Sequence, residues 1–396
     1  MYRHILVAID NSDCSNHGID MGVSLAKEFG AKIVGNHVYA ARLHDMRFQQ
    51  MESGLPEQYQ REDELERQRR IHDSLIGRGL QLISESYLAR FQERCRQMSV
   101  QYEVKIPEGR NYEELIKDVR ASEYDLAIIG AFGLGRVSRS LIGSVCERVT
   151  RGVRSDVLIV KDSAVLAGSR LLVAIDGSSS SFAALDKALV LSRALGCQVE
   201  AAAVYDPFFH SVAFGSIAKV LSEEAGKVFR FREQEKLHDE IIDNGLMKLY
   251  AAHLERARAV AADRGIEITT SLLAGKPFAK ILEFLEERSF GLLLIGRFGL
   301  HYCDGLDIGS TAENLVRLAP TNVLVVGGGQ SRVNDVAAAP EAKGLPWTPE
   351  AEAMLQRVPP FARGMARRAI EELAREKGYS AVTPEAVTEA RRRMGM

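Results

Sequence analysis

The sequence predicts an α/β protein with two tandem domains, each a doubly wound parallel sheet of five strands, followed by a small C-terminal three-helix domain. Three observations support this prediction. The segment His4–Asp10 (HILVAID) returns as Arg170–Asp176 (RLLVAID). In both halves, short apolar runs alternate with helical patterns, which is typical of βαβ units. After Val326 the chain becomes rich in Gly and Ala, which indicates a linker.

The internal repeat determines the predicted domain organisation. Gly130 and Gly296 are separated by the same 166 residues as Asp10 and Asp176, without net insertion or deletion. A duplication of this length indicates two whole domains rather than a solenoid, whose repeats are several times shorter. We therefore expect α/β domains at residues 1–163 and 168–328, a linker at 329–344 and a helical domain at 345–396.

Each strand prediction depends on a short apolar run bounded by turn residues. In the first copy we expect strands at residues 4–9, 32–39, 102–106, 125–130 and 156–160. In the second copy we expect strands at residues 170–175, 198–205, 266–273, 291–296 and 322–326. The runs Leu126–Ile129 and Leu292–Ile295 are apolar on both faces, as central parallel strands covered by helices require. The polar stretches 41–98 and 207–264 predict helical insertions rather than disordered loops.

Composition and charge exclude several classes of protein. The chain has 396 residues, of which 46% are hydrophobic, and a formal net charge of −2. We therefore expect no nucleic-acid or membrane partner. The first apolar run, at residues 5–9, is too short for a signal peptide, and no run reaches membrane-spanning length. The cysteines are scattered and form no CxxC pair, which argues against disulfides or a zinc site and favours a reducing cytoplasm. They are Cys14, Cys95, Cys146, Cys197 and Cys303.

A glycine-rich loop follows the fourth predicted strand in both copies. It reads G-x2-G-x9-G-S, from Gly130 to Ser144 and from Gly296 to Ser310. Glycines lack a Cβ and tolerate positive φ, so backbone N–H groups can converge on an anion. The helix that follows adds free N–H groups and its positive dipole end. The loop therefore predicts a phosphate site, although the glycines could also serve only to form the turn. No GxxxxGK[ST] motif occurs, which excludes a P-loop NTPase.

Together with these loops, the opening strand at 4–9 and the closing strands at 156–160 and 322–326 resemble the ATP-binding branch of the universal stress protein family. The resemblance covers about residues 1–328. It implies a sheet order of 3-2-1-4-5 in each domain, with ATP and Mg²⁺ in the crevice where the strand order reverses.

Carried over by position, the resemblance implies roles for residues of both copies. Asp10 and Asp176 would lie near adenine or a bound metal, and Val38 and Val204 would lie against adenine. Gly130, Gly133, Gly296 and Gly299 would lie under the ribose and phosphates. The phosphates would be held by Gly143, Ser144 and Val145 in the first copy and by Gly309, Ser310 and Thr311 in the second. For the aspartates, an equal alternative is that Asp10 or Ser12 stabilises a helix N-terminus.

Both copies depart from the family pattern. Phe132 and Leu134, like Phe298 and Leu300, stand where the family often has a polar residue and an arginine. The family's Asp-Gly-Ser is present after Ile175 but reads Asp-Asn-Ser after Ile9. The second loop also carries His301, Cys303, Asp304 and Asp307, whereas we expect no acid beside the phosphates of the first copy. We therefore expect stronger nucleotide binding in the first copy.

The predicted insertions share a His-Asp pair, His72-Asp73 and His238-Asp239, again 166 residues apart. The pairs fit the polar side of an amphipathic helix. A metal or proton-sensitive site is the alternative, and it requires the two copies to meet.

The C-terminal segment predicts three short helices. Two of them begin at Thr348-Pro349-Glu350 and Thr383-Pro384-Glu385, each an N-cap followed by proline and an acid. The segment 345–391 is similar to the C-terminal domain of one of the subunits of light-independent protochlorophyllide reductase. The rest of that reductase is absent, so we expect no reductase activity. We expect this module to dock a protein partner or an apolar ligand. Trp347, Phe361 and Met365 would pack together, and Arg363 and Arg367 would form a cationic strip or pair with Glu371.

The functional expectation is a non-enzymatic, ATP-binding stress-response or signalling protein. The alternatives are a slow Mg²⁺-dependent ATPase or nucleotide-transferring enzyme, and a scaffold whose nucleotide sites have decayed. The closing strands are apolar edges that invite aggregation, so we expect the two copies to pack through them as an internal pseudo-dimer. A homo-oligomer is also compatible with the sequence.

Overall fold

The computed structural model describes residues 1–207, 243–300, 305–327 and 345–355, together with a part of 367–393. It divides into two compact units, Met1–Arg332 and Val333–Met396. None of the helices described is both long enough and apolar enough to cross a membrane.

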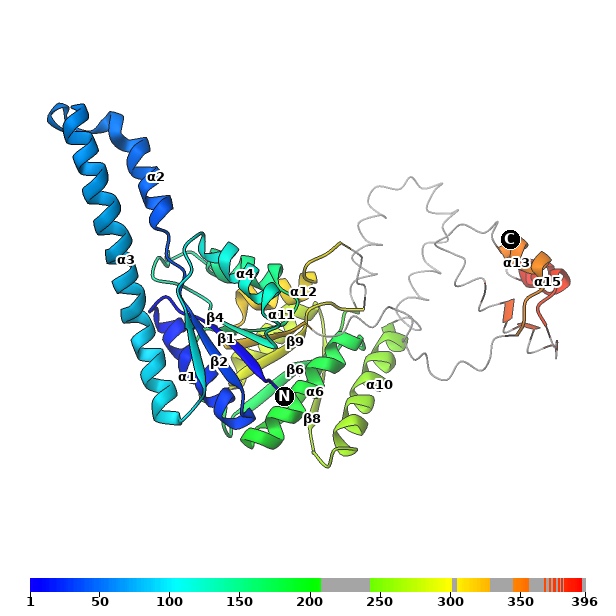
Figure 1. Ribbon diagram of the computed structural model, residues 1–396. Helices are drawn as coiled ribbons and strands as arrows, with labels where there is room; N and C mark the ends of the chain where they lie inside the picture. The colour runs from blue at the N-terminus through cyan, green and yellow to red at the C-terminus, as the bar shows by residue number, and fades with distance from the viewer. Residues whose placement is uncertain are drawn as a thin grey trace. The chain divides into compact units, whose positions relative to one another are not determined.

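The first unit contains one sheet of ten strands in the order β3-β2-β1-β4-β5-β10-β9-β6-β7-β8 (Figure 1). The first half contributes β1 (His4–Ala8), β2 (Lys32–Asn36), β3 (Tyr102–Lys105), β4 (Leu126–Gly130) and β5 (Asp156–Val160). The second half contributes β6 (Arg170–Ala174), β7 (Gln198–Tyr205), β8 (Thr269–Ala274), β9 (Leu292–Gly296) and β10 (Asn322–Val326). Neighbouring strands within each half are parallel. The expected order 3-2-1-4-5 is confirmed in both halves.

The helices cover both faces of this sheet. The first half contains α1 (Asp13–Phe29), α2 (Ala41–Met51), α3 (Glu62–Met98), α4 (Asn111–Ala121) and α5 (Ser144–Gly152). The second half contains α6 (Ser179–Leu195), α10 (Asp243–Ala262), α11 (Pro277–Glu287) and α12 (Ser310–Leu318). Alternate strand residues enter opposite cores. Ile5 and Val7 belong to the core that contains residues of α1, α3, α6 and α10, whereas Leu6 belongs to the core that contains residues of α4, α5, α11 and α12. This two-sided burial explains the nearly continuous apolar strands.

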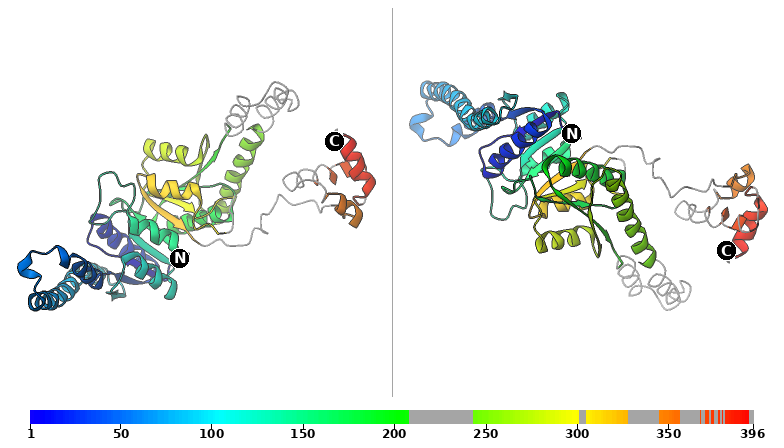
Figure 2. Two further views of the ribbon diagram at one scale, coloured as in Figure 1. Left: turned by 90° about the horizontal axis from the view of Figure 1, so that it is seen from above. Right: turned by 90° about the horizontal axis from the view of Figure 1, so that it is seen from below.

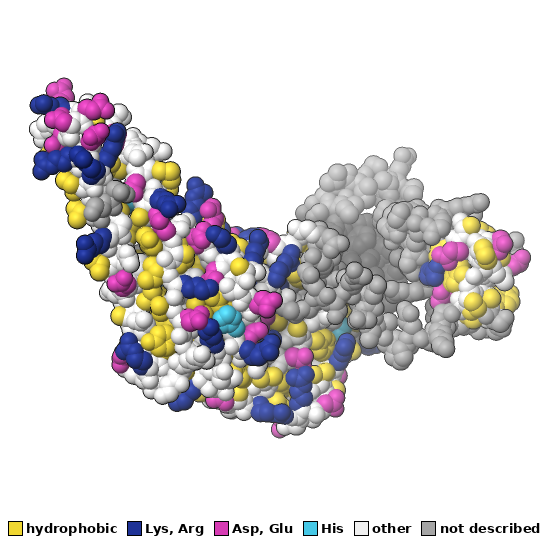
Figure 3. Space-filling model, viewed as in Figure 1, with side chains coloured by type: hydrophobic (Ala, Val, Ile, Leu, Met, Phe, Trp, Pro, Cys, Tyr) yellow, Lys and Arg dark blue, Asp and Glu magenta, His cyan; other side chains and the backbone are white. Residues whose placement is uncertain are grey.

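The insertion of the first half is helical, as predicted. It comprises α2, the short 3₁₀ helices Glu52–Gly54 and Glu57–Tyr59, and α3, and it extends away from the sheet (Figure 1). We call this helical insertion, residues 41–98, the arm. Hydrophobic side chains lie exposed along the arm, and charges of both signs gather at its far end (Figure 3). The corresponding second insertion is described only from α10 onward. His238-Asp239 therefore lies outside the described residues, and the side chains of His72 and Asp73 are not described either.

The two halves lie side by side (Figure 2) and join through their last strands. β5 and β10 pair antiparallel, and Leu158 lies opposite Leu324, the residue at its own position in the repeat. A pairing in which equivalent residues face each other is that of a two-fold interface. The predicted pairing of the closing strands is thus confirmed, and no apolar edge is left at this junction.

The second unit contains α13 (Pro349–Leu355) and α15 (Pro384–Arg393). Arg367, Ile370 and Leu373 are also helical, where the middle helix is predicted. The prediction for Phe361, Arg363 and Met365 lies outside the described residues. A buried cluster unites the helices: Ala351, Leu355, Ile370, Leu373, Ala374, Val382, Ala386, Val387 and Ala390.

One prediction for this unit is wrong. Arg367 does not pair with Glu371: its guanidinium binds Glu352 at 2.5 Å and lies over the Trp347 ring at 4.8 Å. Glu371 instead accepts a hydrogen bond from Trp347 Nε1 at 2.8 Å. Arg367 is therefore engaged within the unit, and the predicted strip with Arg363 lies partly outside the described residues.

Candidate functional site

Each half of the sheet holds a cavity at the carboxyl ends of its first and fourth strands. The volumes are about 650 Å³ in the first half and about 460 Å³ in the second. This is the point where the strand order reverses, which is the usual ligand position in such sheets. The first cavity is lined by all the residues expected there: Asp10, Val38, Gly130, Gly133, Gly143, Ser144 and Val145. The same is true of the second: Asp176, Val204, Gly296, Gly299, Gly309, Ser310 and Thr311.

The loop glycines are required by close packing and not by their φ angles. Gly143 has φ −74° and ψ 142°, which any residue can adopt. A Cβ at Gly143 would lie 3.0 Å from the carbonyl oxygen of Ala131, and one at Gly130 would lie 3.0 Å from Ser15 N. The Gly143 N–H closes the loop by donating to that same Ala131 oxygen at 2.7 Å. The glycines of the G-x2-G-x9-G-S motif do not use the positive φ that glycine tolerates.

The helix after each loop begins without a side-chain cap. Gly143 is the N-cap of α5 and Gly309 is the N-cap of α12, and neither can supply a capping oxygen. The first residues of both helices line the cavities. N–H groups at a helix start have no intrahelical partner, and the helix dipole is positive there. The arrangement suits an anion in each cavity.

Asp10 and Asp176 accept hydrogen bonds from the serines two residues further along the chain. Asp10 Oδ1 accepts hydrogen bonds from Ser12 N at 3.0 Å and from Ser12 Oγ at 2.6 Å, and Ser12 is the N-cap of α1. Asp176 makes the same two bonds with Ser178, and its Oδ2 also accepts from Leu300 N at 3.1 Å. The contacts of both aspartates therefore correspond to the alternative role, in which they stabilise a helix N-terminus through the N-cap serine. In the described part of the chain, no three His, Cys, Asp or Glu side chains gather as metal ligands would.

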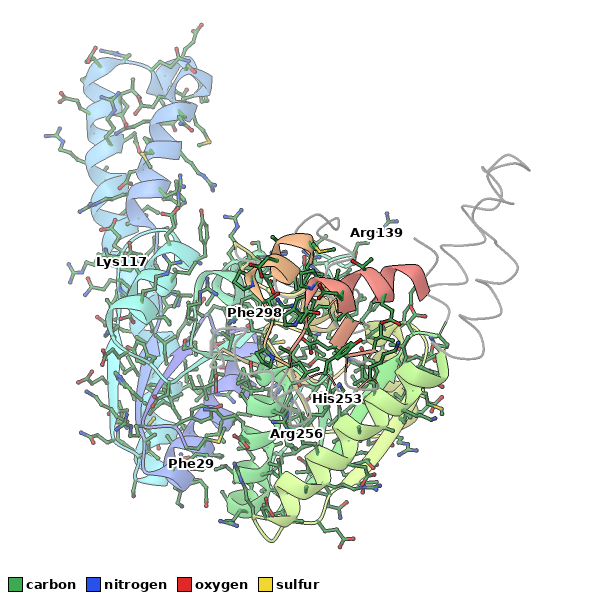
Figure 4. The ribbon with its side chains drawn as sticks, turned by 90° about the vertical axis from the view of Figure 1, so that its right-hand side faces the viewer. Phe29, Lys117, Arg139, His253, Arg256 and Phe298 are labelled. Atoms are coloured by element: carbon green, nitrogen blue, oxygen red, sulfur yellow. The ribbon has the colours of Figure 1, made fainter. Side chains whose placement is uncertain are left out.

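Aromatic side chains form a wall of each cavity that the sequence did not reveal. His37 and Tyr87 line the first cavity, with ring centroids 5.2 Å apart. Tyr250 of α10 lines the second cavity, and its ring centroid lies 5.7 Å from that of His253. His253 is labelled on α10 in Figure 4. Tyr87 and Tyr250 come from the insertions, whose path over the sheet cannot be read from a local pattern. Burial lowers the pKa of His253 against the opposing effect of Asp176.

Arg136 is a second residue that sequence reasoning missed. It lies in the first loop, lines the cavity and stacks over the Phe132 ring at 4.2 Å. Arg136 supplies a positive charge within the loop, although Leu134 occupies the position at which the family often has an arginine.

Acidic residues line both cavities, which corrects the expectation for the first copy. Glu147, in the first turn of α5, lines the first cavity, and its Oε1 lies 2.5 Å from a guanidinium nitrogen of Arg317. Asp307 and Glu313 line the second cavity. His301, Cys303 and Asp304 lie outside the described residues. Glu147 and Glu313 occupy equivalent positions in the repeat, so Asp307, whose equivalent is Leu141, is the described acid that distinguishes the second cavity from the first.

The described cysteines are free thiols, and Cys14, Cys95, Cys146 and Cys197 are all buried. Burial raises the pKa of Cys95 and of Cys146 to about 12. These thiols therefore stay protonated at neutral pH and are poor nucleophiles.

Comparisons with known proteins relate both halves to one family. Residues 1–161 and 169–327 match the universal stress protein family. A universal stress protein of Methanocaldococcus jannaschii is 27% identical over 161 residues, which cover 41% of this chain and 83% of that protein. The crystal structure of a universal stress protein from Archaeoglobus fulgidus has a TM-score of 0.53 at 19% identity. It covers 82% of this chain and 97% of its own, and it shows a shared fold.

The C-terminal unit is similar to a different family. Residues 347–391 match the family described as Proto-chlorophyllide reductase 57 kD subunit. One of the subunits of light-independent protochlorophyllide reductase from Chlorobium limicola is 35% identical over 100 residues. The match covers 25% of this chain and only 18% of that relative. The predicted resemblance is confirmed, and it concerns a small part of the relative's length.

Proposed function

The chain belongs to the universal stress protein family, and from this premise we propose that it binds adenine nucleotides, with ATP and Mg²⁺ in its first cavity. The observation that carries the proposal is the convergence of the expected residues on a cavity beside an uncapped helix start. Members of the family often bind nucleotides. The second cavity has the same construction and is proposed as a second nucleotide site.

The chemistry of the first cavity supports each part of this ligand. Backbone N–H groups at the start of α5 suit phosphate oxygens, and Arg136 adds a positive charge. Val38 is buried, and with Tyr87 it offers an apolar wall for a base. Mg²⁺ is commonly held by one or two carboxylates together with phosphates and waters, so a larger protein cluster is not needed. Asp10 and Glu147 are the carboxylates that line this cavity.

We propose a binding role rather than catalysis because one oxygen of each carboxylate in the first cavity is held by a neighbouring side chain, which opposes a role as general base but leaves the other oxygen for Mg²⁺. Asp10 accepts from Ser12, and Glu147 binds Arg317. A slow Mg²⁺-dependent ATPase or a nucleotide-transferring enzyme remains the alternative, and the similarity of the C-terminal unit to part of a reductase also leaves an enzymatic activity open. A turnover of about 1 per second or more would favour the enzyme.

The physiological role proposed here is a cytoplasmic stress response in which nucleotide occupancy alters contacts with partners. The C-terminal unit is proposed to dock a protein or an apolar ligand.

Titration calorimetry of ATP in the presence of Mg²⁺ tests the proposal. In Gly143→Val, the new side chain would push on the Ala131 carbonyl, and we expect the binding stoichiometry to fall by one site. Gly54→Val is the matched control, because a Cβ at Gly54 meets nothing within 4 Å and the residue lies in the arm. Thermal melting checks that both variants fold. Absence of ATP binding to the wild type would refute the function, and unchanged stoichiometry in Gly143→Val would refute the site assignment.

A further inference from the structure

Arg151 belongs to the first half of the chain but lines the cavity of the second half. It lies in the last turn of α5 and reaches across the junction between β5 and β10. One guanidinium nitrogen lies 3.0 and 3.1 Å from the two carboxylate oxygens of Asp307, and the other binds Glu313. Both acids line the same second cavity.

The repeat shows that this contact is specific to the second cavity. Arg317 is the equivalent of Arg151, and it binds Glu147, the equivalent of Glu313. The position equivalent to Asp307, however, is Leu141, which carries no charge. Arg317 is not among the described residues that line the first cavity. Asp307 is therefore the feature that distinguishes the position of Arg151 from that of Arg317.

Asp307 and Arg151 line the second cavity together with the first residues of α12. Asp307 lies two residues before Gly309, the N-cap of α12. Burial raises the pKa of Asp307, but the hydrogen bond and the charge of Arg151 outweigh it, so the net pKa is lowered and the group stays ionised. The Arg151 side chain is 30% exposed, so a ligand can reach it. A guanidinium fork binds phosphate oxygens in the same bidentate way as it binds a carboxylate.

We propose that Arg151 is a phosphate-contacting residue of the second nucleotide site, and that Asp307 competes with the ligand's phosphate for its guanidinium. This inference rests on the proposed nucleotide binding. The first half of the chain thus completes the site of the second half, and the Arg151–Asp307 pair sets how strongly that site favours phosphorylated ligands.

The competition predicts effects of opposite sign for the two partners. Arg151→Gln removes the proposed phosphate contact and leaves Asp307 facing the phosphates without the cation that pairs with it, whereas Glu313 keeps its 2.7 Å ion pair with Arg317. ATP affinity of the second cavity should therefore fall by about tenfold or more. Asp307→Asn removes one of the carboxylates that hold Arg151, while Glu313 still pairs with it, and it also removes one charge that repels the phosphates. ATP affinity should therefore rise by at least about threefold. Adenosine has no phosphate, and its affinity should change by less than about twofold in both variants.

The test is calorimetry on the full chain with the first site disabled by Gly143→Val, using ATP and adenosine as ligands. Arg264→Gln is the matched control. It removes an arginine and its 2.7 Å ion pair with Asp186, and Arg264 is not among the residues that line either cavity. Arg151→Lys, which keeps the charge without the fork, should lie between Arg151→Gln and the parent protein. Two-site titrations without the Gly143→Val change serve as a cross-check.

The outcomes separate this inference from the function on which it rests. If ATP binds neither cavity of the wild type, the nucleotide function fails and the inference fails with it. If ATP binds the second cavity but Asp307→Asn does not raise its affinity, the competition is refuted. An equal loss of adenosine and ATP affinity in Arg151→Gln would assign Arg151 a purely structural role at the junction. If Arg151→Gln does not fold, the expected rise in ATP affinity of Asp307→Asn still tests the proposed competition.

Discussion

Two cations cross the junction between the halves and bind the ends of helices on the other side. Lys161, after β5, donates from Nζ to the carbonyl oxygen of Ala319 at 2.6 Å, just beyond α12. Arg297, after β9, is buried and donates to the carbonyl oxygen of Thr150 at 2.5 Å in the last turn of α5. A cation is favourable at a helix C-terminus because the dipole is negative there. Each half thus stabilises the last helix of the other.

The cost of burying Lys161 predicts a pH dependence of stability. Burial lowers its pKa from 10.5 to about 8. Below the folded-state pKa, the amine is protonated in both the folded and the unfolded chain. Between the folded-state pKa and the unfolded-state pKa, only the unfolded chain holds the proton, so the free energy of unfolding rises with pH. We expect the free energy of unfolding of the wild type, relative to Lys161→Met, to increase by about 1–2 kcal/mol between about pH 7 and about pH 9.5. Urea denaturation at both pH values measures this, and a pH-independent difference would contradict it.

The turn after the first strand of each half holds different residues at equivalent positions, and only the contacts in the structure explain the difference. Asn11 and Gly177 are equivalent, and both adopt positive φ, 63° and 89°. The sequence shows only that Asn replaces Gly, and Asn tolerates this conformation. In the second half, however, a Cβ at position 177 would lie 2.4 Å from Nε2 of His253 on α10. The residue equivalent to His253 is Tyr87, so the helix residue that crowds position 177 has no histidine counterpart in the first half.

At the scale of elements, the strands were the most predictable part of the fold. Every predicted strand is present, and the largest boundary differences are at β8, which begins at Thr269 rather than at residue 266, and at β2, which ends at Asn36 rather than at residue 39. Strands buried on both faces leave an unmistakable apolar run. The insertion was predictable as helical, but the length of α3, from Glu62 to Met98, was not, because its polar surface carries little periodic signal.

The β5–β10 pairing predicts a coupled pair of core mutations. Leu158 and Leu324 face each other and are fully buried, so Leu→Ala at either position should lower the free energy of unfolding by about 2–5 kcal/mol. Because the two residues are neighbours, the double variant should depart from additivity by about 0.5–3 kcal/mol. Leu285→Ala, on the opposite face in α11, is the control and should combine additively with Leu158→Ala. Denaturant unfolding measures all of these proteins, and strict additivity for Leu158 and Leu324 would argue against their contact.

At the scale of the whole molecule, the candidate site was predictable only within each half. The glycines, serines and aspartates of each cavity follow from the repeat and the family resemblance. The ion pairs across the junction join residues 156 to 170 positions apart, so no local pattern marks them. Once the two-fold pairing is known, Arg151 with Glu313 and Arg317 with Glu147 follow as equivalent contacts. Asp307 does not, because its counterpart is Leu141.

The division into two compact units predicts that the C-terminal unit is dispensable for nucleotide binding. Residues Val333–Met396 form their own unit with a separate buried cluster, and each cavity is built from residues of Met1–Arg332. Deleting residues 341–396 should therefore leave ATP affinity within about threefold, a change of roughly 0.7 kcal/mol. Calorimetry on the shortened and the full chain, with thermal melting as the folding control, measures this. A larger loss of affinity would mean that the C-terminal unit closes over a bound nucleotide, and the proposal of an independent docking module would then have to be abandoned.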